Sequence, residues 1–130
     1  MSIIPMSELI RFLAGDTHIF LPSEFELDQY LFDWVRNPNY VELSFFYYDD
    51  GSCGIFIDSR NTASMNYVPK IQYTHDSNGG YYSYGGRVIT GIGHTHDDDR
   101  VGASVTDITN RNRISDLPHY IFDFRGYTEY

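Results

Sequence analysis

A pair of strand-forming segments joined by a short turn places the strongest constraint on the fold of this chain. Residues 40–48 (YVELSFFYY) are rich in β-branched and aromatic residues, and residues 53–58 (CGIFID) follow them after the sequence DDGS. Such side chains fit the pleated surface of a sheet, whereas Asp, Gly and Ser favour turns. We therefore expect a β-hairpin over residues 40–58.

The segment before this hairpin has the pattern of helices. Ser7 and Gly15 are suitable start and stop residues for a short helix between them. Ser23 and Glu26 form a capping box ahead of a second helix, and Pro38 disfavours helix at the residue before it. The apolar residues of this second helix recur on one face: Leu27, Leu31, Trp34 and Val35.

Strand-forming segments and turns alternate through the rest of the chain. Further strands are expected within residues 67–73 and 81–96, which the turn-forming sequence HDSNGG separates. One helix is expected from about residue 104 to residue 113. Residues 119–124 and 127–130 are expected to form a closing hairpin around Arg125-Gly126.

This order of elements indicates an α+β fold rather than a regular βαβ alternation. We expect N-terminal helices followed by a mixed or antiparallel sheet, with one helix carrying a Ser-x-x-Asp segment. The 130 residues fit a single domain, with a helical part over residues 1–39 and a β-rich part over residues 40–130.

Two histidines, His94 and His96, lie one residue apart at the end of an apolar strand segment. Residues i and i+2 of a strand point to the same face, so both imidazoles are expected to lie together. Two neutral histidine nitrogens and one carboxylate are a common ligand set of catalytic zinc. The ordinary alternative is a pair of surface histidines at a strand end. The other histidines, His18, His75 and His119, lack spaced partners and are expected to be ordinary.

After a gap of seven residues from His96 comes Ser104, and Asp107 is the third residue after Ser104. Alone, Ser-x-x-Asp is typical of a helix start, where both side chains cap free backbone N–H groups. The two roles are compatible, because a serine can cap the helix while Asp107, one turn in, faces a metal. The joint spacing, H-x-H-x7-S-x-x-D, is more specific than either half.

This joint spacing resembles the motif of the JAMM (MPN+) metalloprotease family, which has two histidines, a loop and then Ser-x-x-Asp. Over residues 40–130 the order of strands, motif, helix and final aromatic hairpin is similar to the compact JAMM-like domains at the C-termini of bacterial polymorphic toxins. The resemblance implies a JAMM-like or cytidine-deaminase-like fold and hydrolysis of a peptide or isopeptide bond.

The resemblance also implies a role for each motif residue. His94, His96 and Asp107 would hold Zn²⁺, and Ser104 would hydrogen-bond the developing oxyanion. The family has an upstream glutamate as general base, and Glu42 is the candidate, with a solvent-facing strand position as its alternative. Many family members have proline after the second histidine. Here Asp97 begins a run of three aspartates instead. This run is either a solvated loop or the source of the third metal ligand in place of Asp107.

The resemblance implies a protein or peptide substrate and, in the toxin setting, a cognate immunity protein. The chain is then expected in the cytoplasm, or delivered into a target cell as part of a larger secreted toxin. No signal peptide is recognisable in the sequence MSIIPMSELIRF, and no apolar run approaches the ~18 residues of a membrane span.

The net charge of −9 makes electrostatic binding to nucleic acid unfavourable, because such binding depends on Lys and Arg. It leaves two other functions open. One is a different metal-dependent hydrolase on the same site, and the other is an acidic protein-binding module such as an immunity protein. The single cysteine, Cys53, excludes an intrachain disulfide and is expected to be an ordinary strand residue.

Overall fold

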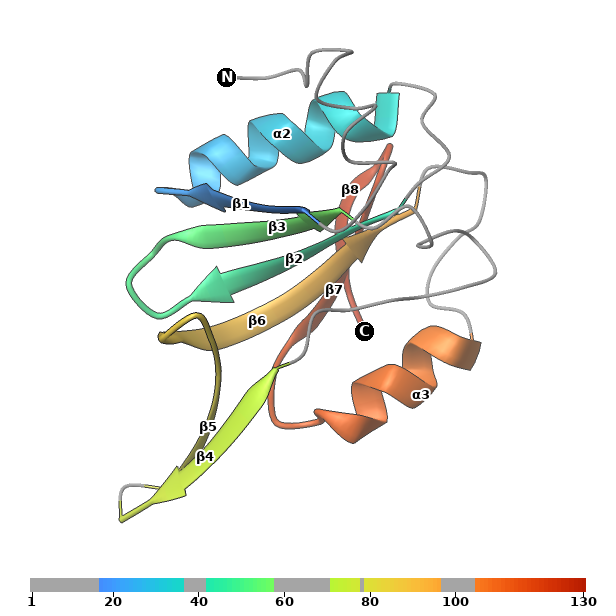
Figure 1. Cartoon of the computed structure of the whole chain (residues 1–130). Helices are drawn as coiled ribbons and strands as arrows, with labels where there is room; N and C mark the ends of the chain where they lie inside the picture. The colour runs from blue at the N-terminus through green and yellow to red at the C-terminus, as the bar shows by residue number, and fades with distance from the viewer. Residues whose placement is uncertain (1–16, 37–41, 58–70, 78, 97–104) are drawn as a thin grey trace.

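The computed structural model describes residues 17–36, 42–57, 71–77, 79–96 and 105–130, and the statements below refer to these residues. They form eight strands and two helices, most of them in one sheet (Figure 1). In chain order the elements are β1 (Thr17–Leu21), α2 (Glu24–Arg36), β2 (Leu43–Tyr48), β3 (Cys53–Ile57), β4 (Gln72–Asp76), β5 (Gly79–Tyr84), β6 (Arg87–Thr95), α3 (Val105–Arg113), β7 (His119–Asp123) and β8 (Gly126–Glu129).

Strand β6 connects the two parts of the sheet. One edge of β6 pairs with β2, and β3 and β1 follow β2, all antiparallel. The other edge pairs at its start with β5, which leads to β4, and at its end with β7, which leads to β8. The β6–β7 pairing is parallel, and α3 lies between these strands in the sequence. Parallel neighbours need such a crossover connection.

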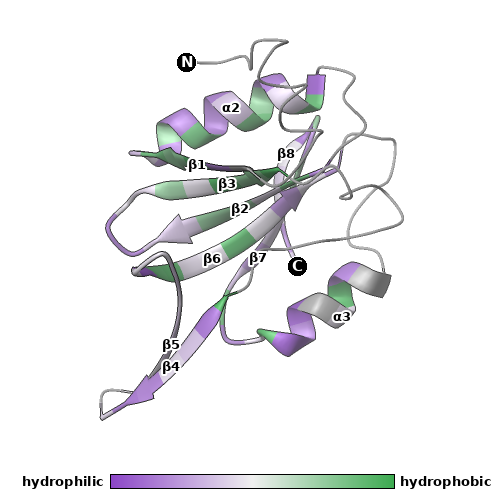
Figure 2. Ribbon diagram, in the orientation of Figure 1, coloured by the Kyte–Doolittle hydropathy of each residue, from purple (hydrophilic) through white to green (hydrophobic). Residues whose placement is uncertain are grey.

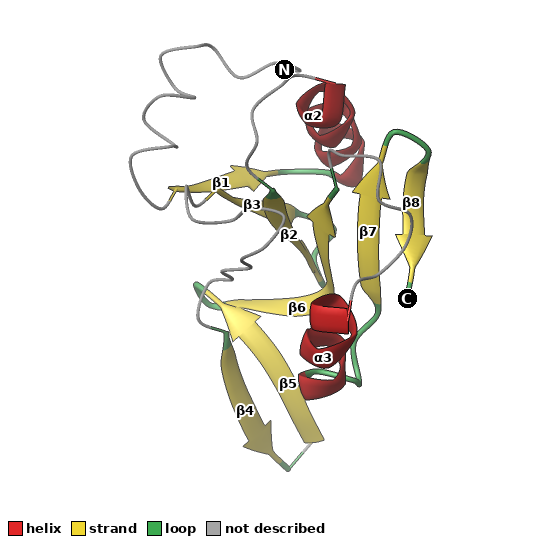
Figure 3. Ribbon diagram, turned by 90° about the vertical axis from the view of Figure 1, so that its right-hand side faces the viewer, coloured by secondary structure: helices red, strands yellow, loops and turns green. Residues whose placement is uncertain are grey.

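The two helices lie on opposite sides of the sheet (Figures 1 and 3). Helix α2 buries the face that the sequence predicts, and the backbone N–H of Glu26 donates to Ser23 Oγ at 3.3 Å at its start. This face packs on the side of the sheet that includes Phe45 and Ile55. The buried residues of the helix are Leu27, Tyr30, Leu31, Trp34 and Val35.

The opposite face of the sheet carries a second, smaller core. Alternation along β2 turns Phe46 and Tyr48 to this side, where they pack with Phe56 and Ile89. Ile114, just after α3, is packed against this cluster. Figure 2 shows the hydrophobic residues concentrated in the central strands, whereas β4 is mostly hydrophilic. Of the two helices described, neither has the length and apolar character that crossing a membrane requires.

The predicted fold class is wrong. The described residues are mostly strand, with only two short helices, and the part before residue 40 is not helical throughout. Residues Thr17–Leu21 form β1, which pairs with β3 from Thr17↔Ile57 to Leu21↔Cys53. A five-residue edge strand depends on a partner far along the chain, so local patterns do not reveal it. The expected helix between Ser7 and Gly15 lies outside the described residues.

Several individual elements are confirmed. The β2–β3 hairpin, α2, α3 and the β7–β8 hairpin all lie where the sequence places them, within a few residues. The segment 81–96 is divided between β5 and β6 by a turn at Gly85 and Gly86. Both glycines have positive φ, 59° and 79°, which is the conformation that a tight two-residue hairpin turn requires.

Candidate metal centre

His94 and His96 lie at the C-terminal end of β6, on the side of the sheet that faces α3. The register pairs His94 with Ser44 of β2, and Ile92 with Phe46, which belongs to the second core. Alternation along β6 then turns Ile92, His94 and His96 to the same side. The strand therefore presents both imidazoles together, as the spacing H-x-H predicts.

Asp107 comes to these histidines from α3. It lies in the first turn of the helix, which follows β6 in the sequence and leads into β7, the parallel neighbour of β6. The N-terminus of a helix carries a partial positive charge, which favours an ionised carboxylate there. The β6–α3–β7 connection thus positions an acidic side chain opposite the end of β6.

The three side chains converge on one point. His94 Nε2 lies 3.1 Å from Asp107 Oδ1, and His96 Nε2 lies 3.3 Å from Asp107 Oδ2. The two Nε2 atoms are 3.1 Å apart. The side chains are also buried, with exposed fractions of 6% for His94, 1% for His96 and 7% for Asp107.

This arrangement fits a metal ion. Two ligands that share a tetrahedral zinc ion at about 2.0–2.1 Å are separated by about 3.3 Å, close to the distances between these atoms. A buried carboxylate is costly without a compensating positive charge, which a bound cation supplies. One ligand atom from each residue lies within 4.8 Å of the other two, so His94, His96 and Asp107 could hold a metal ion.

Glu42 lies beside this group on the same side of the sheet. It directly precedes β2, and alternation places it on the face of Ser44, whose partner is His94. The same antiparallel register, continued by two residues, puts Glu42 opposite His96. A hydrogen bond from the Leu43 N–H to Thr95 Oγ1, at 2.9 Å, joins the two strands here. Glu42 is 5% exposed, so the solvent-facing alternative is wrong.

Two residues of the predicted site are not placed. Ser104 and Asp97 lie outside the described residues. Ser104 comes directly before Val105, the first residue of α3. The predicted roles of Ser104, and of Asp97 as an alternative ligand, therefore stay predictions.

Two further side chains border the site, and the sequence did not indicate them. Tyr130 lies edge-on to His94, with ring centroids 6.1 Å apart, and His119 is 5.9 Å from the Tyr130 ring. Burial, and then the charge of Asp107, raise the pKa of the Tyr130 phenol, so Tyr130 is a neutral hydroxyl. Neither residue has a local sequence signal, because they reach His94 through the pairing of β7 with β6 and with β8.

His119, for which the sequence predicts an ordinary histidine, is buried beside the site. Its Nε2–H donates to the carbonyl of Ile114 at 2.7 Å. Burial lowers its pKa; the Ile114 carbonyl opposes this shift, and the nearby Arg111 adds to it. The neutral form of His119 is therefore favoured, and it ties the end of the α3 segment to β7.

A second buried carboxylate, Asp123, lies at the end of β7 near His96. The backbone N–H of His96 donates to the backbone carbonyl of Phe122 at 3.0 Å, and Phe122 directly precedes Asp123. Burial by itself would raise the pKa of Asp123. Hydrogen bonds from the side chain and backbone N–H of Arg125, and the charge of Arg125, outweigh burial and hold this pKa below its usual range. Asp123 is thus an ionised neighbour of the site.

Comparison of the chain with protein-family models, with curated proteins and with solved structures gave no match. The function of this group of residues is therefore inferred from its geometry and from the spacing of its members along the chain.

Proposed function

We propose that this protein is a zinc-dependent hydrolase of amide bonds in a protein or peptide substrate, with His94, His96 and Asp107 as the zinc ligands. The observation that carries the proposal is the convergence of two imidazole nitrogens and one carboxylate at 3.1–3.3 Å in a buried position. Three protein ligands of this kind are typical of catalytic zinc sites, which keep a fourth position open. Zinc bound there supplies a Lewis acid, which polarises a substrate carbonyl and makes water more acidic.

Glu42 is the proposed general base. Its carboxylate is on the same face as the two histidines and is buried, which suits a group that exchanges protons inside a site. It would take a proton from the attacking water and deliver it to the leaving amine. Glu42 is not a member of the ligand group, so this role is separable from metal binding.

Ser104 is the proposed donor to the oxyanion of the tetrahedral intermediate. The support is its place in the sequence, directly before α3 and three residues before Asp107. A hydroxyl that donates to a developing negative charge contributes a few kcal/mol in comparable sites, about 2.7–4 kcal/mol. The resemblance of the spacing H-x-H-x7-S-x-x-D to the JAMM motif supports the same assignment.

The variant Glu42→Gln tests the proposal. Gln preserves the shape of Glu but cannot accept a proton, so zinc content should equal that of the wild type while hydrolysis falls by ~10² to 10⁴. Zinc is measured by mass spectrometry on protein purified without added metal, and hydrolysis with a mixture of quenched fluorescent peptides. Glu129→Gln, at an exposed position of β8, is the matched control and should change neither quantity.

Three results would contradict the proposal. Wild-type protein without a stoichiometric metal would exclude the zinc site. Equal hydrolysis by the wild type and Glu42→Gln would exclude Glu42 as the base. Bound zinc without hydrolysis of any peptide or isopeptide-linked substrate would leave a structural metal site.

A further inference from the structure

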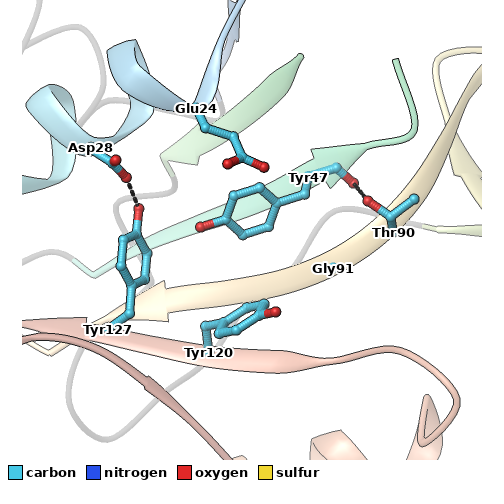
Figure 4. Close-up of a pocket in the computed structure, with 7 residues that line it drawn as sticks. All are labelled: Glu24, Asp28, Tyr47, Thr90, Gly91, Tyr120 and Tyr127. Atoms are coloured by element: carbon cyan, nitrogen blue, oxygen red, sulfur yellow. Dashed lines mark hydrogen bonds between the residues drawn. The ribbon is translucent and has the colours of Figure 1, made fainter. Parts of the chain in front are cut away.

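A second site lies on the other side of the sheet, under the first turns of α2. It is a cavity of about 380 Å³ between this helix and strands β2, β6, β7 and β8 (Figure 4). Its walls carry aromatic and acidic side chains. The lining includes Glu24, Asp28, Tyr47, Gly91, Tyr120 and Tyr127.

Three tyrosine rings form the walls of this cavity. The ring of Tyr47 lies 5.6 Å from that of Tyr120 at an interplanar angle of 74°, and Tyr120 lies 6.3 Å from Tyr127 at 77°. The faces of such rings carry the negative part of an aromatic quadrupole and attract cations. The three rings line one cavity and contact each other at steep angles.

Gly91 forms the floor between two of these rings. A Cβ atom at this position would lie 3.1 Å from the Tyr47 ring and 3.3 Å from the Tyr120 ring. Any larger residue would therefore push on the two aromatic walls and fill part of the space. The glycine keeps the cavity open at its base.

Two carboxylates complete the site. Glu24 and Asp28 are four residues apart on α2, so they lie on one face of the helix, and Asp28 accepts a hydrogen bond from the Tyr127 hydroxyl (Figure 4). Like charges at this spacing repel each other, and among the described residues that line the cavity none is basic. Burial and the neighbouring carboxylates raise the pKa of both Tyr47 and Tyr127, so the phenols stay neutral. Glu24 and Asp28 are both exposed at the rim of the cavity, where a bound cation would lie between two side chains of opposite charge.

We propose that this cavity binds an organic cation, an alkylammonium or guanidinium group. Aromatic rings and two carboxylates, which all attract a positive charge, line the same small space. The volume is at the small end of ligand pockets, which suits one side-chain-sized group. The net charge of −9 favours the approach of cations to the molecule. The group comes either from a Lys or Arg side chain of a protein partner or from a free amine.

Choline and its uncharged carbon isostere, 3,3-dimethylbutan-1-ol, test the proposal on the wild-type protein. The two molecules have the same shape, so a cation site binds choline and an ordinary apolar pocket binds both. Saturable changes in the NMR signals of Gly91 and Tyr120 with choline alone are expected. No saturation up to 50 mM choline, or equal binding of the alcohol, would overturn the proposal.

Variants identify the residues responsible. Tyr120→Leu removes one ring and should weaken choline binding about 3- to 30-fold, whereas Tyr120→Phe should retain it. Glu24→Gln should weaken binding at low salt and less in 0.5 M NaCl, where the charge is screened. Tyr81→Leu in β5 and Asp49→Asn in the β2–β3 turn are exposed, matched controls. Equal losses in controls and cavity variants would contradict the assignment.

A separate binding experiment distinguishes the two possible sources of the cation. N-acetyl-lysine methylamide presents the side chain alone, and a lysine-containing peptide adds a neighbouring chain. Peptide binding at least tenfold tighter supports a protein partner, and equal affinities support a free amine. Because the site lies on the opposite face from His94, His96 and Asp107, its failure would not affect the proposed metal site, nor would failure of the metal site affect it.

Discussion

Asp107 combines two influences on one buried carboxylate. The N-terminus of α3 stabilises its negative charge, and the Nε2 atoms of His94 and His96 lie against its two oxygens. A cation bound to all three would accept a lone pair from each imidazole nitrogen and from the carboxylate.

The ligands can be tested one by one. His94→Ala, His96→Ala and Asp107→Ala should each lose bound zinc, because two remaining protein ligands are too few to hold it. His75→Ala, at an exposed position of β4, is the matched control and should keep zinc. Metal content by mass spectrometry is compared at equal folded fraction, measured by circular dichroism. If Asp107→Ala keeps zinc and Asp97→Ala loses it, the loop supplies the third ligand.

Cys53 illustrates a residue whose environment excludes reactivity. It is fully buried in β3, and burial, together with the charges of Glu24 and Asp28, raises the pKa of its thiol to about 12. The thiolate is the nucleophilic form, so the folded protein at pH 8 should not react with a thiol reagent such as iodoacetamide. Protein unfolded in guanidinium chloride should react at the rate of a free cysteine. Rapid labelling of the folded protein would contradict the burial of Cys53.

At the scale of elements, β6 is the strand that both sites share. Alternation sends His94 and His96 to one face and Gly91 and Gly93 to the other. The ring of Phe45 lies so close to Gly93 that a Cβ there would be 2.2 Å from it. Gly93 thus lets the Phe45 side chain of β2 pack closely on one face of β6, while the opposite face of β6 carries the two histidines.

Helix α2 is expected to contribute stability through its buried face. Leu31→Ala should lower the free energy of unfolding by about 2 to 5 kcal/mol, because Leu31 is completely buried and the change leaves a cavity. Phe25→Ala, on the same helix, removes a side chain that is 71% exposed and should change stability little. Urea denaturation followed by circular dichroism measures both. Similar losses for the two variants would show that the helix packs differently.

At the scale of the whole molecule, the candidate metal ligands come from two different elements. His94 and His96 belong to the sheet, and Asp107 belongs to α3. An ion held by all three therefore ties the helix to the sheet. The three side chains come together only in the folded chain, so binding of a metal to them would stabilise the fold.

Zinc should raise the thermal stability of the protein. A ligand that binds only the folded state at 100 times its Kd adds about 2.7 kcal/mol, which is a shift of several degrees in Tm. EDTA should reverse the shift, and Asp107→Ala should show none. Differential scanning calorimetry with and without zinc measures the effect. An equal shift in Asp107→Ala would mean that zinc binds elsewhere.

Local patterns in the sequence determined most of the individual elements. The capping box at Ser23 and Glu26 and the apolar period after it predicted α2, and the run of strand-forming residues around the DDGS turn predicted β2 and β3. These signals are reliable because they depend on neighbours within one or two turns of chain. The alternation of His94 and His96 is of the same kind, since the period of a strand fixes which residues share a face.

Only the tertiary structure decided which distant residues meet. Strand β1 forms because it pairs with the edge of β3. No local pattern indicates that partner, so the sequence predicts helix in the N-terminal part. Pairing of β7 with β6 and with β8 brings His119 and Tyr130 to His94, and α3 brings Asp107 there. The acidic, tyrosine-lined cavity likewise needs five elements to assemble it. Contacts between residues close in the sequence set the local conformation, so local patterns predict it. The two sites depend on pairing between distant segments, which stabilises the fold only when the whole sheet forms.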